Sequence, residues 1–327
     1  MKPKVFITRK IPEAGLDLIR PIAEIEVWDD ELPPLRDSIL EKVKGVNGLL
    51  TLLTDKIDSQ VMDAAGASLK VISQMAVGYD NIDVAAATAR KIPVGHTPGV
   101  LTETTADFTW ALLMSAARRI VEGDNYTRDG KWKTWMPTLL LGPDVHGARL
   151  GIIGLGRIGQ AVAKRAKGFD MRVVYHSPHR HPEIEKELGV EYASLDSLYA
   201  ESDFISIHTP LNDSTYHLIN DAALAKMKPS AILINTARGG VIDPEALYCA
   251  LRDKKIACAA LDVTEPEPIP LESPLLTLDN IIIAPHIASA SFQTRNKMAT
   301  MAAENLIAGL KGEKLPHRVA DGRRRDA

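Results

Sequence analysis

The chain has 327 residues, 45% hydrophobic and 25% charged, and this length and ordinary globular composition favour two domains. Its 39 basic and 42 acidic residues leave a net charge of -3, so no overall field would hold it on nucleic acid or an anionic membrane, and any charged partner is expected to be small. Cys249 and Cys258 lack disulfide-framework or zinc-type spacing, and no apolar run approaches the roughly 20 residues of a membrane span, so we expect a cytoplasmic protein without a metal.

The first hundred residues alternate short β-rich runs with helical stretches. The strand-like runs are residues 4–8, 24–28, 48–53 and 70–75, and the helical stretches between them include 12–20 and 59–65. Apolar runs of this length are typical of strands that are buried on both faces of a parallel sheet. The pattern predicts a small parallel α/β unit, which contains no glycine-rich phosphate loop.

Residues 102–128 keep apolar positions at helical spacing, and we expect one long helix there. A polar loop with two tryptophans follows at 130–146. Strand-like cores then alternate with helical stretches, at residues 149–153, 172–175, 204–208, 231–235 and 281–285. These alternations predict a doubly wound parallel sheet.

The last helical stretch, residues 291–310, follows the final strand and is surplus to the second sheet. We expect it to return to the first domain, so that residues 1–98 and 288–327 form one domain and residues 99–287 form the other. The basic sequence DGRRRDA at 321–327 is expected to be a solvated tail rather than a binding patch.

A glycine-rich loop joins the first strand of the second domain to the following helix. It reads Gly154-Leu155-Gly156-Arg157-Ile158-Gly159, the pattern G-x-G-x-x-G. The first glycine permits a tight turn, the second lets the backbone approach a pyrophosphate, and the third lets the helix pack on the strand. The loop predicts a dinucleotide site at the helix N-terminus; the alternative is a glycine-rich turn without a ligand.

The second strand of this domain ends without the acidic residue that holds the adenosine ribose of NAD. It ends at Ser177 and continues through His179 and Arg180, with no acid before Glu183. A missing carboxylate removes like-charge repulsion toward a 2′-phosphate, and a guanidinium offers that phosphate a forked contact. The segment predicts a preference for NADP(H), with use of NAD(H) left open; the alternative is that Arg180 only decorates a surface turn.

Three charged or titratable residues, Arg238, Glu267 and His286, follow strand-like segments of the second domain. Reduction of a carbonyl group by a nicotinamide needs a proton at the carbonyl oxygen as hydride arrives at carbon. A histidine whose protonated form is favoured by a carboxylate suits that task, and an arginine can pair with a carboxylate of the substrate and polarise the carbonyl. Taken singly, each residue has a structural alternative, which is a surface salt bridge for the arginine or glutamate and a cap or packing role for the histidine.

Several segments stand in the order that is found in one enzyme family. They are AVGYDNID at 76–83, the glycine loop, HTPL at 208–211, NTARGGVID at 235–243, LDV at 261–263 and PHIAS at 285–289. Through them, essentially the whole chain resembles the D-isomer-specific 2-hydroxyacid dehydrogenases. The resemblance implies an Arg-Glu-His catalytic trio, and the family's spacing of 29 residues after the arginine selects Glu267 over the neighbouring Glu265.

The resemblance also implies a fold and further site residues. It implies a Rossmann cofactor domain inserted into a flavodoxin-like substrate domain. The substrate would be held by the backbone amides of Val77 and Gly78, by Leu53, which closes over it, and by Arg238 and His286. The remaining cofactor contacts implied are Thr105, Thr209, Pro210, Thr236, Ala237, Asp262 and Ala288.

The tryptophan-bearing loop at 130–137 resembles the glyoxylate/hydroxypyruvate reductase branch of the family. In that branch a tryptophan of the partner subunit reaches the substrate pocket. The resemblance transfers this role to Trp135 and implies a homodimer; the alternative is that the tryptophans only anchor a long loop.

Together these observations predict an enzyme that reduces glyoxylate or hydroxypyruvate with NADPH. An NAD-linked D-lactate or 3-phosphoglycerate dehydrogenase is one alternative, against which the segment 177–180 and Trp135 argue. A nicotinamide-sensing, corepressor-like interaction protein is another, and a turnover assay separates it from an enzyme.

Overall fold

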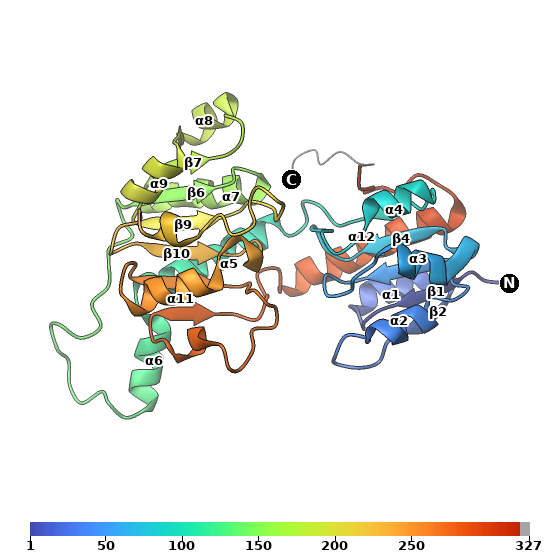
Figure 1. The fold of residues 1–327 in the computed structure, drawn as a ribbon, viewed down its shortest axis with the longest axis horizontal. Helices are drawn as coiled ribbons and strands as arrows, with labels where there is room; N and C mark the ends of the chain where they lie inside the picture. The colour runs from blue at the N-terminus through green and yellow to red at the C-terminus, as the bar shows by residue number, and fades with distance from the viewer. Residues whose placement is uncertain (321–327) are drawn as a thin grey trace. The chain divides into compact units, whose positions relative to one another are not determined.

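The computed structural model describes residues 1–320, and the chain divides into two compact units (Figure 1). Of the described residues, the first unit contains 1–101 and 290–320, and the second contains Thr102–Ser289. The basic sequence at 321–327, expected to be a solvated tail, lies outside the described residues.

The sheet of the first unit has parallel strands throughout. They are β1 (Lys4–Ile7), β2 (Glu24–Val27), β3 (Gly48–Thr51), β4 (Val71–Gln74) and β5 (Val94–Gly95). Their order is β2-β1-β3-β4-β5. This is the flavodoxin-like order, in which the chain starts inside the sheet and reverses direction between β1 and β3. The side chains of β3 and β4 are buried throughout, as expected for strands covered on both faces.

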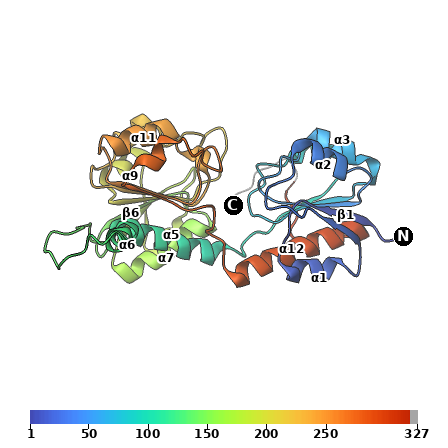
Figure 2. The same cartoon turned by 90° about the horizontal axis from the view of Figure 1, so that it is seen from below.

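Helices cover both faces of this first sheet. They are α1 (Glu13–Ile19), α2 (Arg36–Lys42), α3 (Ser59–Ala65), α4 (Val84–Ala89) and α12 (Phe292–Lys311), with the 3-10 turn η1 (Gly66–Ser68). Figure 2 shows α1 and α12 on one face and α2 and α3 on the other. The final helix begins after Ser291, whose side chain accepts a hydrogen bond from the amide of Thr294. It packs on α1, β3 and β4, and its Met298 and Leu306 are buried in the same core as Leu16.

The second unit contains a larger parallel sheet. Its strands are β6 (Arg149–Ile153), β7 (Arg172–His176), β8 (Glu191–Tyr192), β9 (Phe204–Ile207), β10 (Ile232–Asn235), β11 (Cys258–Leu261) and β12 (Ile281–Ile283). Their order is β12-β11-β10-β9-β6-β7-β8, with every pairing parallel. The order reverses between β6 and β9, which makes this a doubly wound, Rossmann-type sheet. The predicted fold class, two doubly wound α/β domains, is confirmed.

Two strands of this sheet were not among the strand-like runs expected from the sequence. The segment that forms β11 reads CAAL and has no β-branched or aromatic residue, so its intrinsic preference for a strand is weak. The segment that forms β8 has only two residues, and both are exposed. The β11 strand forms because its neighbours β10 and β12 supply partners on both sides.

Helices also cover both faces of the second sheet. They are α5 (Thr102–Ala117), α6 (Ile120–Arg128), α7 (Arg157–Ala166), α8 (Pro182–Leu188), α9 (Leu195–Glu201), α10 (Asp221–Leu224) and α11 (Pro244–Arg252). Short 3-10 turns are η2 (Lys167–Phe169), η3 (Gly239–Val241) and η4 (Pro274–Thr277). Figure 2 shows α5 and α7 on one face and α9 and α11 on the other. No helix within residues 1–320 combines the length and apolarity that crossing a membrane requires.

The expectation of one long helix over 102–128 is wrong. The helix ends at Ala117, and α6 starts after Arg119, which adopts a left-handed conformation with φ 51°. The Arg119 guanidinium pairs with Glu122 at 2.8 Å and also donates to the carbonyl of Leu141. The apolar spacing suggested one continuous helix, but only the α5 part buries its apolar face, and α6 has no buried residue.

Candidate active site

The sequence-predicted cofactor loop lies where β6 gives way to α7. Gly154 has φ 94°, and its amide donates to the carbonyl of His176 at 2.8 Å. A Cβ at Gly154 would lie 2.7 Å from the His208 carbonyl oxygen, and one at Gly159 would collide with the carbonyl oxygen of Gly154. Gly156 is the N-cap of α7 and makes no side-chain cap. The glycines therefore bring backbone from β6, β9 and α7 together at the topological switch point, where nucleotides bind in such sheets.

The remaining loop residues divide between core and helix. Leu155 is buried, and its amide donates to the Ser177 hydroxyl oxygen at 2.9 Å, while Arg157 and Ile158 form the first turn of α7. Ser177 is itself buried. The Ser177 side chain thus ties the end of β7 to the glycine loop, a task that the sequence did not indicate.

Arg180 and His179 lie on the exposed segment after β7. The guanidinium of Arg180 donates to both carboxylate oxygens of Glu185, at 3.1 and 2.6 Å, and lies over the ring of Tyr192. The Tyr175 hydroxyl donates to the same carboxylate, and these two hydrogen bonds, Arg180 first, hold the pKa of Glu185 below its usual range. Glu185 therefore orients Arg180 and competes with any anion that Arg180 would bind.

The structure brings His286 and Glu267 together. The Nδ1 atom of His286 lies 2.5 Å from Oε1 of Glu267, and both side chains are partly exposed. Glu267 follows β11 and His286 follows β12, which are adjacent strands. The neighbouring Glu265 has a different partner, because its Oε2 lies 2.7 Å from Nε2 of His217. The structure therefore pairs Glu267 with His286 and Glu265 with His217.

Asp262 fixes the turn that presents His286. The amide of His286 donates to the Asp262 carbonyl at 2.9 Å, and His286 adopts φ 55°. The Asp262 side chain is buried and accepts the amides of Ile287 at 2.8 Å and Ala288 at 2.7 Å. Burial raises the pKa of the Asp262 carboxyl, and those two hydrogen bonds act in the opposite direction. Asp262, which was expected to contact the cofactor, accepts one of these amides on each carboxylate oxygen.

Arg238 follows β10, half-buried and in extended backbone conformation. The side chain of Asn235 donates to the Arg238 carbonyl at 2.8 Å, and Arg238 Nη1 donates to the Ala237 carbonyl at 2.8 Å. A Cβ at Gly239, the next residue, would collide with the carbonyl of Thr264. The loop that carries Arg238 is thus in backbone contact with the loop that carries Glu267.

The other expected cofactor residues lie at the same ends of the strands or on the helix that packs beneath them. Thr209 and Pro210 follow β9, and Thr236 and Ala237 follow β10. Thr105 is buried in α5, where its carbonyl accepts the hydroxyl of Thr109. Thr109 lies 2.9 Å from the hydroxyl of Thr236 and was not expected from the sequence.

In the first unit, the expected substrate loop is held through its carbonyl groups. The carbonyl of Val77 lies 2.9 Å from Nδ1 of His96, and the carbonyl of Gly78 accepts from the side chain of Gln74. Within residues 1–320 the amides of Val77 and Gly78 have no hydrogen-bond acceptor. Two backbone donors on a fixed loop are suited to bind an anion.

Asn81 joins this loop to the one that carries Leu53. Its side-chain amide donates to the carbonyls of Leu52 at 3.1 Å and Asp55 at 2.7 Å. The half-buried Leu53 lies between these two carbonyls in the chain, two residues after the end of β3. The structure therefore places the Leu53 and Gly78 loops side by side within the first unit.

Trp135 is largely exposed to solvent. It lies on the loop after α6, in the second unit, with 78% of its surface exposed, and Trp132 on the same loop is 61% exposed. Neither tryptophan is packed into the core of this chain. The alternative that they only anchor the loop to the core of their own subunit is therefore not supported.

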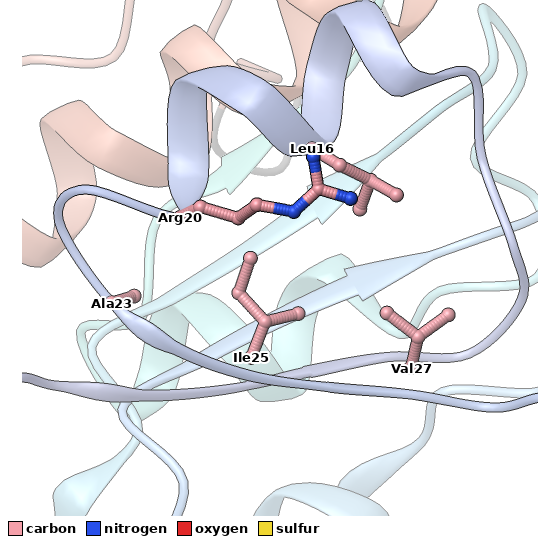
Figure 3. Close-up of a pocket in the computed structure, with 5 residues that line it drawn as sticks. All are labelled: Leu16, Arg20, Ala23, Ile25 and Val27. Carbon is pink, nitrogen blue, oxygen red and sulfur yellow. The ribbon is translucent and has the colours of Figure 1, made fainter.

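A surface pocket of about 260 Å³ lies elsewhere, beside β2 in the first unit. Figure 3 shows Arg20 extending from α1 across its mouth, above Ile25 and Val27 of β2. Arg20 is already paired with Glu13 and Asp17. None of the expected site residues lines this pocket, so it carries no argument about catalysis. Within residues 1–320 there is no group of three His, Cys, Asp or Glu side chains that could hold a metal ion.

Residues 110–288 match the model of the D-isomer specific 2-hydroxyacid dehydrogenase family, NAD binding domain. The chain belongs to this family, which confirms the resemblance found in the sequence. It is an NAD(P)-dependent dehydrogenase that acts on small 2-oxo or 2-hydroxy acids.

Individual relatives match over nearly the full length. A glyoxylate reductase of Korarchaeum cryptofilum is 57% identical over 98% of this chain and 96% of the relative. The crystal structure of the TT0316 protein from Thermus thermophilus superposes with TM-score 0.92 at 49% identity, covering 97% of this chain and 100% of that one. An NADPH-dependent glyoxylate/hydroxypyruvate reductase from Sinorhizobium meliloti, solved with NADP and malonate, superposes with TM-score 0.85 at 32% identity and covers 100% of both chains.

Proposed function

We propose that the protein reduces glyoxylate or hydroxypyruvate to the 2-hydroxy acid with NADPH. The observation that carries the proposal is the 2.5 Å contact between His286 Nδ1 and Glu267, in the unit that also contains the glycine loop. The first unit then serves as the substrate domain and the second as the cofactor domain. Relatives named glyoxylate reductase, at 57% and 53% identity, support the choice of substrate class.

Each group of site residues has a separate role in the proposed reaction. The glycine loop fits a dinucleotide, because a Cβ at Gly154 or Gly159 would collide with neighbouring backbone carbonyls and prevent the tight turn that brings backbone amides to a pyrophosphate. When bound, the reduced nicotinamide supplies the hydride. With Nδ1 facing Glu267, His286 delivers a proton from Nε2 to the carbonyl oxygen of the substrate. Arg238 pairs with the substrate carboxylate and polarises the carbonyl. In the first unit, the amides of Val77 and Gly78 are suited to bind a carboxylate.

The preference for NADPH rests on the segment after β7. The Ser177 oxygen already accepts the Leu155 amide, and no carboxylate takes the place of the ribose acceptor there. Arg180 has a guanidinium that a 2′-phosphate would share with Glu185 or take from it. The relative solved with NADP supports this assignment.

A panel of glyoxylate, hydroxypyruvate and pyruvate, each assayed with NADPH and NADH, tests the proposed function. We expect the highest kcat/KM with NADPH and with glyoxylate or hydroxypyruvate. A higher value for pyruvate, or for NADH with every substrate, would assign the chain to an NAD-linked dehydrogenase such as a D-lactate dehydrogenase instead.

Glu267→Gln is expected to shift the pH profile of the reduction. The Glu267 carboxylate lies 2.5 Å from Nδ1 of His286, and the change removes this negative charge from beside the imidazolium that the reduction uses. Because the reduction uses the protonated histidine, the fall in kcat with rising pH should begin at lower pH. The profile of kcat between pH 5 and 10 measures this shift, and an unchanged profile would refute the pairing.

We further propose that the protein is a homodimer in which Trp135 reaches the substrate pocket of the partner subunit. Trp135→Ala is expected to raise KM for the 2-oxo acid and to leave the dissociation constant of NADPH unchanged. Trp132→Ala is the matched control, since Trp132 is also exposed on the same loop. Equal effects of the two changes, or a monomer in sedimentation equilibrium, would contradict the proposal.

A further inference from the structure

A second histidine–glutamate pair is formed by His217 and Glu265, and Glu265 lies two residues before Glu267 in the chain. Nε2 of His217 is 2.7 Å from Oε2 of Glu265, and its Nδ1 is 3.7 Å from the carboxylate of Asp243. The ring of Tyr216 stacks on the imidazole with centroids 3.9 Å apart. The pair is only partly exposed, at 29% and 33% of the side-chain surface, whereas His146 and Asp170 are each 77% exposed.

This pair joins loops that follow different strands. The amide of His217 donates to the carbonyl of Gly240 at 2.9 Å, and Asp243 caps α11 through the amides of Glu245 and Ala246. A Cβ at Gly240 would lie 3.4 Å from Oε1 of Glu265. The segment before β10, the Arg238 loop and the Glu265 loop therefore meet at this pair.

The loop that carries Glu267 has few backbone anchors of its own. It reads Thr264-Glu265-Pro266-Glu267-Pro268, and its two prolines have no amide to donate. The Thr264 hydroxyl donates to the carbonyl of Pro266 at 2.8 Å, which ties the loop to itself and not to the sheet. The Glu265 side chain is thus a principal attachment of this loop to the rest of the unit.

We propose that His217 and Glu265 are positioning residues, which act through the loop to keep the Glu267 carboxylate on Nδ1 of His286. The inference rests on the proposed function, because it assigns them an effect on that catalytic pair. Glu265 directly precedes Pro266, and Glu267 lies between Pro266 and Pro268. The restricted φ angles of these prolines limit how far Glu267 can move independently of Glu265. Releasing Glu265 then lets Glu267 leave the imidazole.

The charged groups that face each histidine make pH the informative variable. His217 faces Glu265 and Asp243, and His286 faces Glu267 and Asp262. A pair that only stabilised the fold would lower the melting temperature and leave the pH profile of the folded enzyme unchanged. A positioning pair shifts the profile in the direction that Glu267→Gln does, since both changes weaken the same contact.

The experiment compares His217→Gln with His146→Gln in the full-length protein. His146 pairs with Asp170 at 3.0 Å in the same unit but is fully on the surface, with 77% of each side chain exposed, so it controls for loss of a histidine–carboxylate pair. His217→Gln is expected to lower kcat on the order of 10-fold, less than the 10²-fold that a displacement of about 1 Å can cost. Its pH profile should move to lower pH, with the NADPH dissociation constant unchanged. His146→Gln should alter none of these.

Two further variants guard the conclusion. Glu265→Gln keeps an acceptor for His217 and should retain most of kcat, whereas Glu265→Ala should behave like His217→Gln; this comparison carries the test if His217→Gln does not fold. In a Glu267→Gln background, His217→Gln should add no further pH shift. An unshifted profile in His217→Gln, or a full additional shift in the double variant, would overturn the positioning role. An absent shift in Glu267→Gln itself would instead refute the catalytic pairing.

Discussion

His286→Asn is expected to lower kcat by about 10²- to 10⁴-fold, the usual cost of losing a general acid. The asparagine side chain can still donate a hydrogen bond, but it has no proton to transfer at neutral pH. The dissociation constant of NADPH should change little, because the hydrogen-bond partners of His286 are Glu267 and Asp262, and neither belongs to the glycine loop. Steady-state kinetics and a fluorescence titration with NADPH measure the two quantities separately.

His146→Asn is the control for this change, because His146 lies on the surface of the same unit and is also paired with a carboxylate, that of Asp170. It should retain full kcat. A His286→Asn enzyme with near-complete kcat at neutral pH would show that another group delivers the proton. Joint loss of kcat and of NADPH binding would indicate that the turn at Asp262 had collapsed.

The parts of the fold that were predictable are those with a strong local pattern. The buried apolar run of β6 and the helical spacing of α12 each agree with the structure to within a residue or two. β11 and the break at Arg119 were not predictable, because both depend on the surroundings. CAAL becomes a strand only between β10 and β12, and Arg119 leaves the helical conformation where its guanidinium meets Glu122 and Leu141.

The candidate site was predictable where residues occupy a fixed position in a motif. Gly154 follows from the G-x-G-x-x-G spacing after a strand, and the assignment of Glu267 and His286 follows from the resemblance to the family. Side-chain partners brought from other elements were not predictable. Glu185 on Arg180 is the clearest of these, because its pairing depends on how the loop after β7 folds back on α8. No sequence motif indicates this pairing, because the Glu185 carboxylate lies several residues after Arg180 on a separate helix.

The largest change in specificity is expected from the double substitution Ser177→Asp with Arg180→Ala. It restores an acceptor for the ribose of NADH, removes the partner of the 2′-phosphate and places a carboxylate where that phosphate would lie. It also leaves the Glu185 carboxylate without its cation, which adds repulsion toward the phosphate. The ratio of kcat/KM for NADPH over NADH should be well above one in the wild type and fall below one in the variant.

The expected size of the change in cofactor preference follows from the solvent exposure of Arg180. Because Arg180 is on the surface, its contribution belongs at the lower end for charge-assisted hydrogen bonds, roughly 10-fold in affinity. The new carboxylate at 177 adds to this by repulsion, so the double variant should exceed Arg180→Ala alone. Lys186→Ala is the control, since it removes an exposed positive charge from the neighbouring helix α8 and should leave the ratio unchanged. A wild type that prefers NADH, or a double variant with an unaltered ratio, would show that cofactor specificity is set outside the segment after β7.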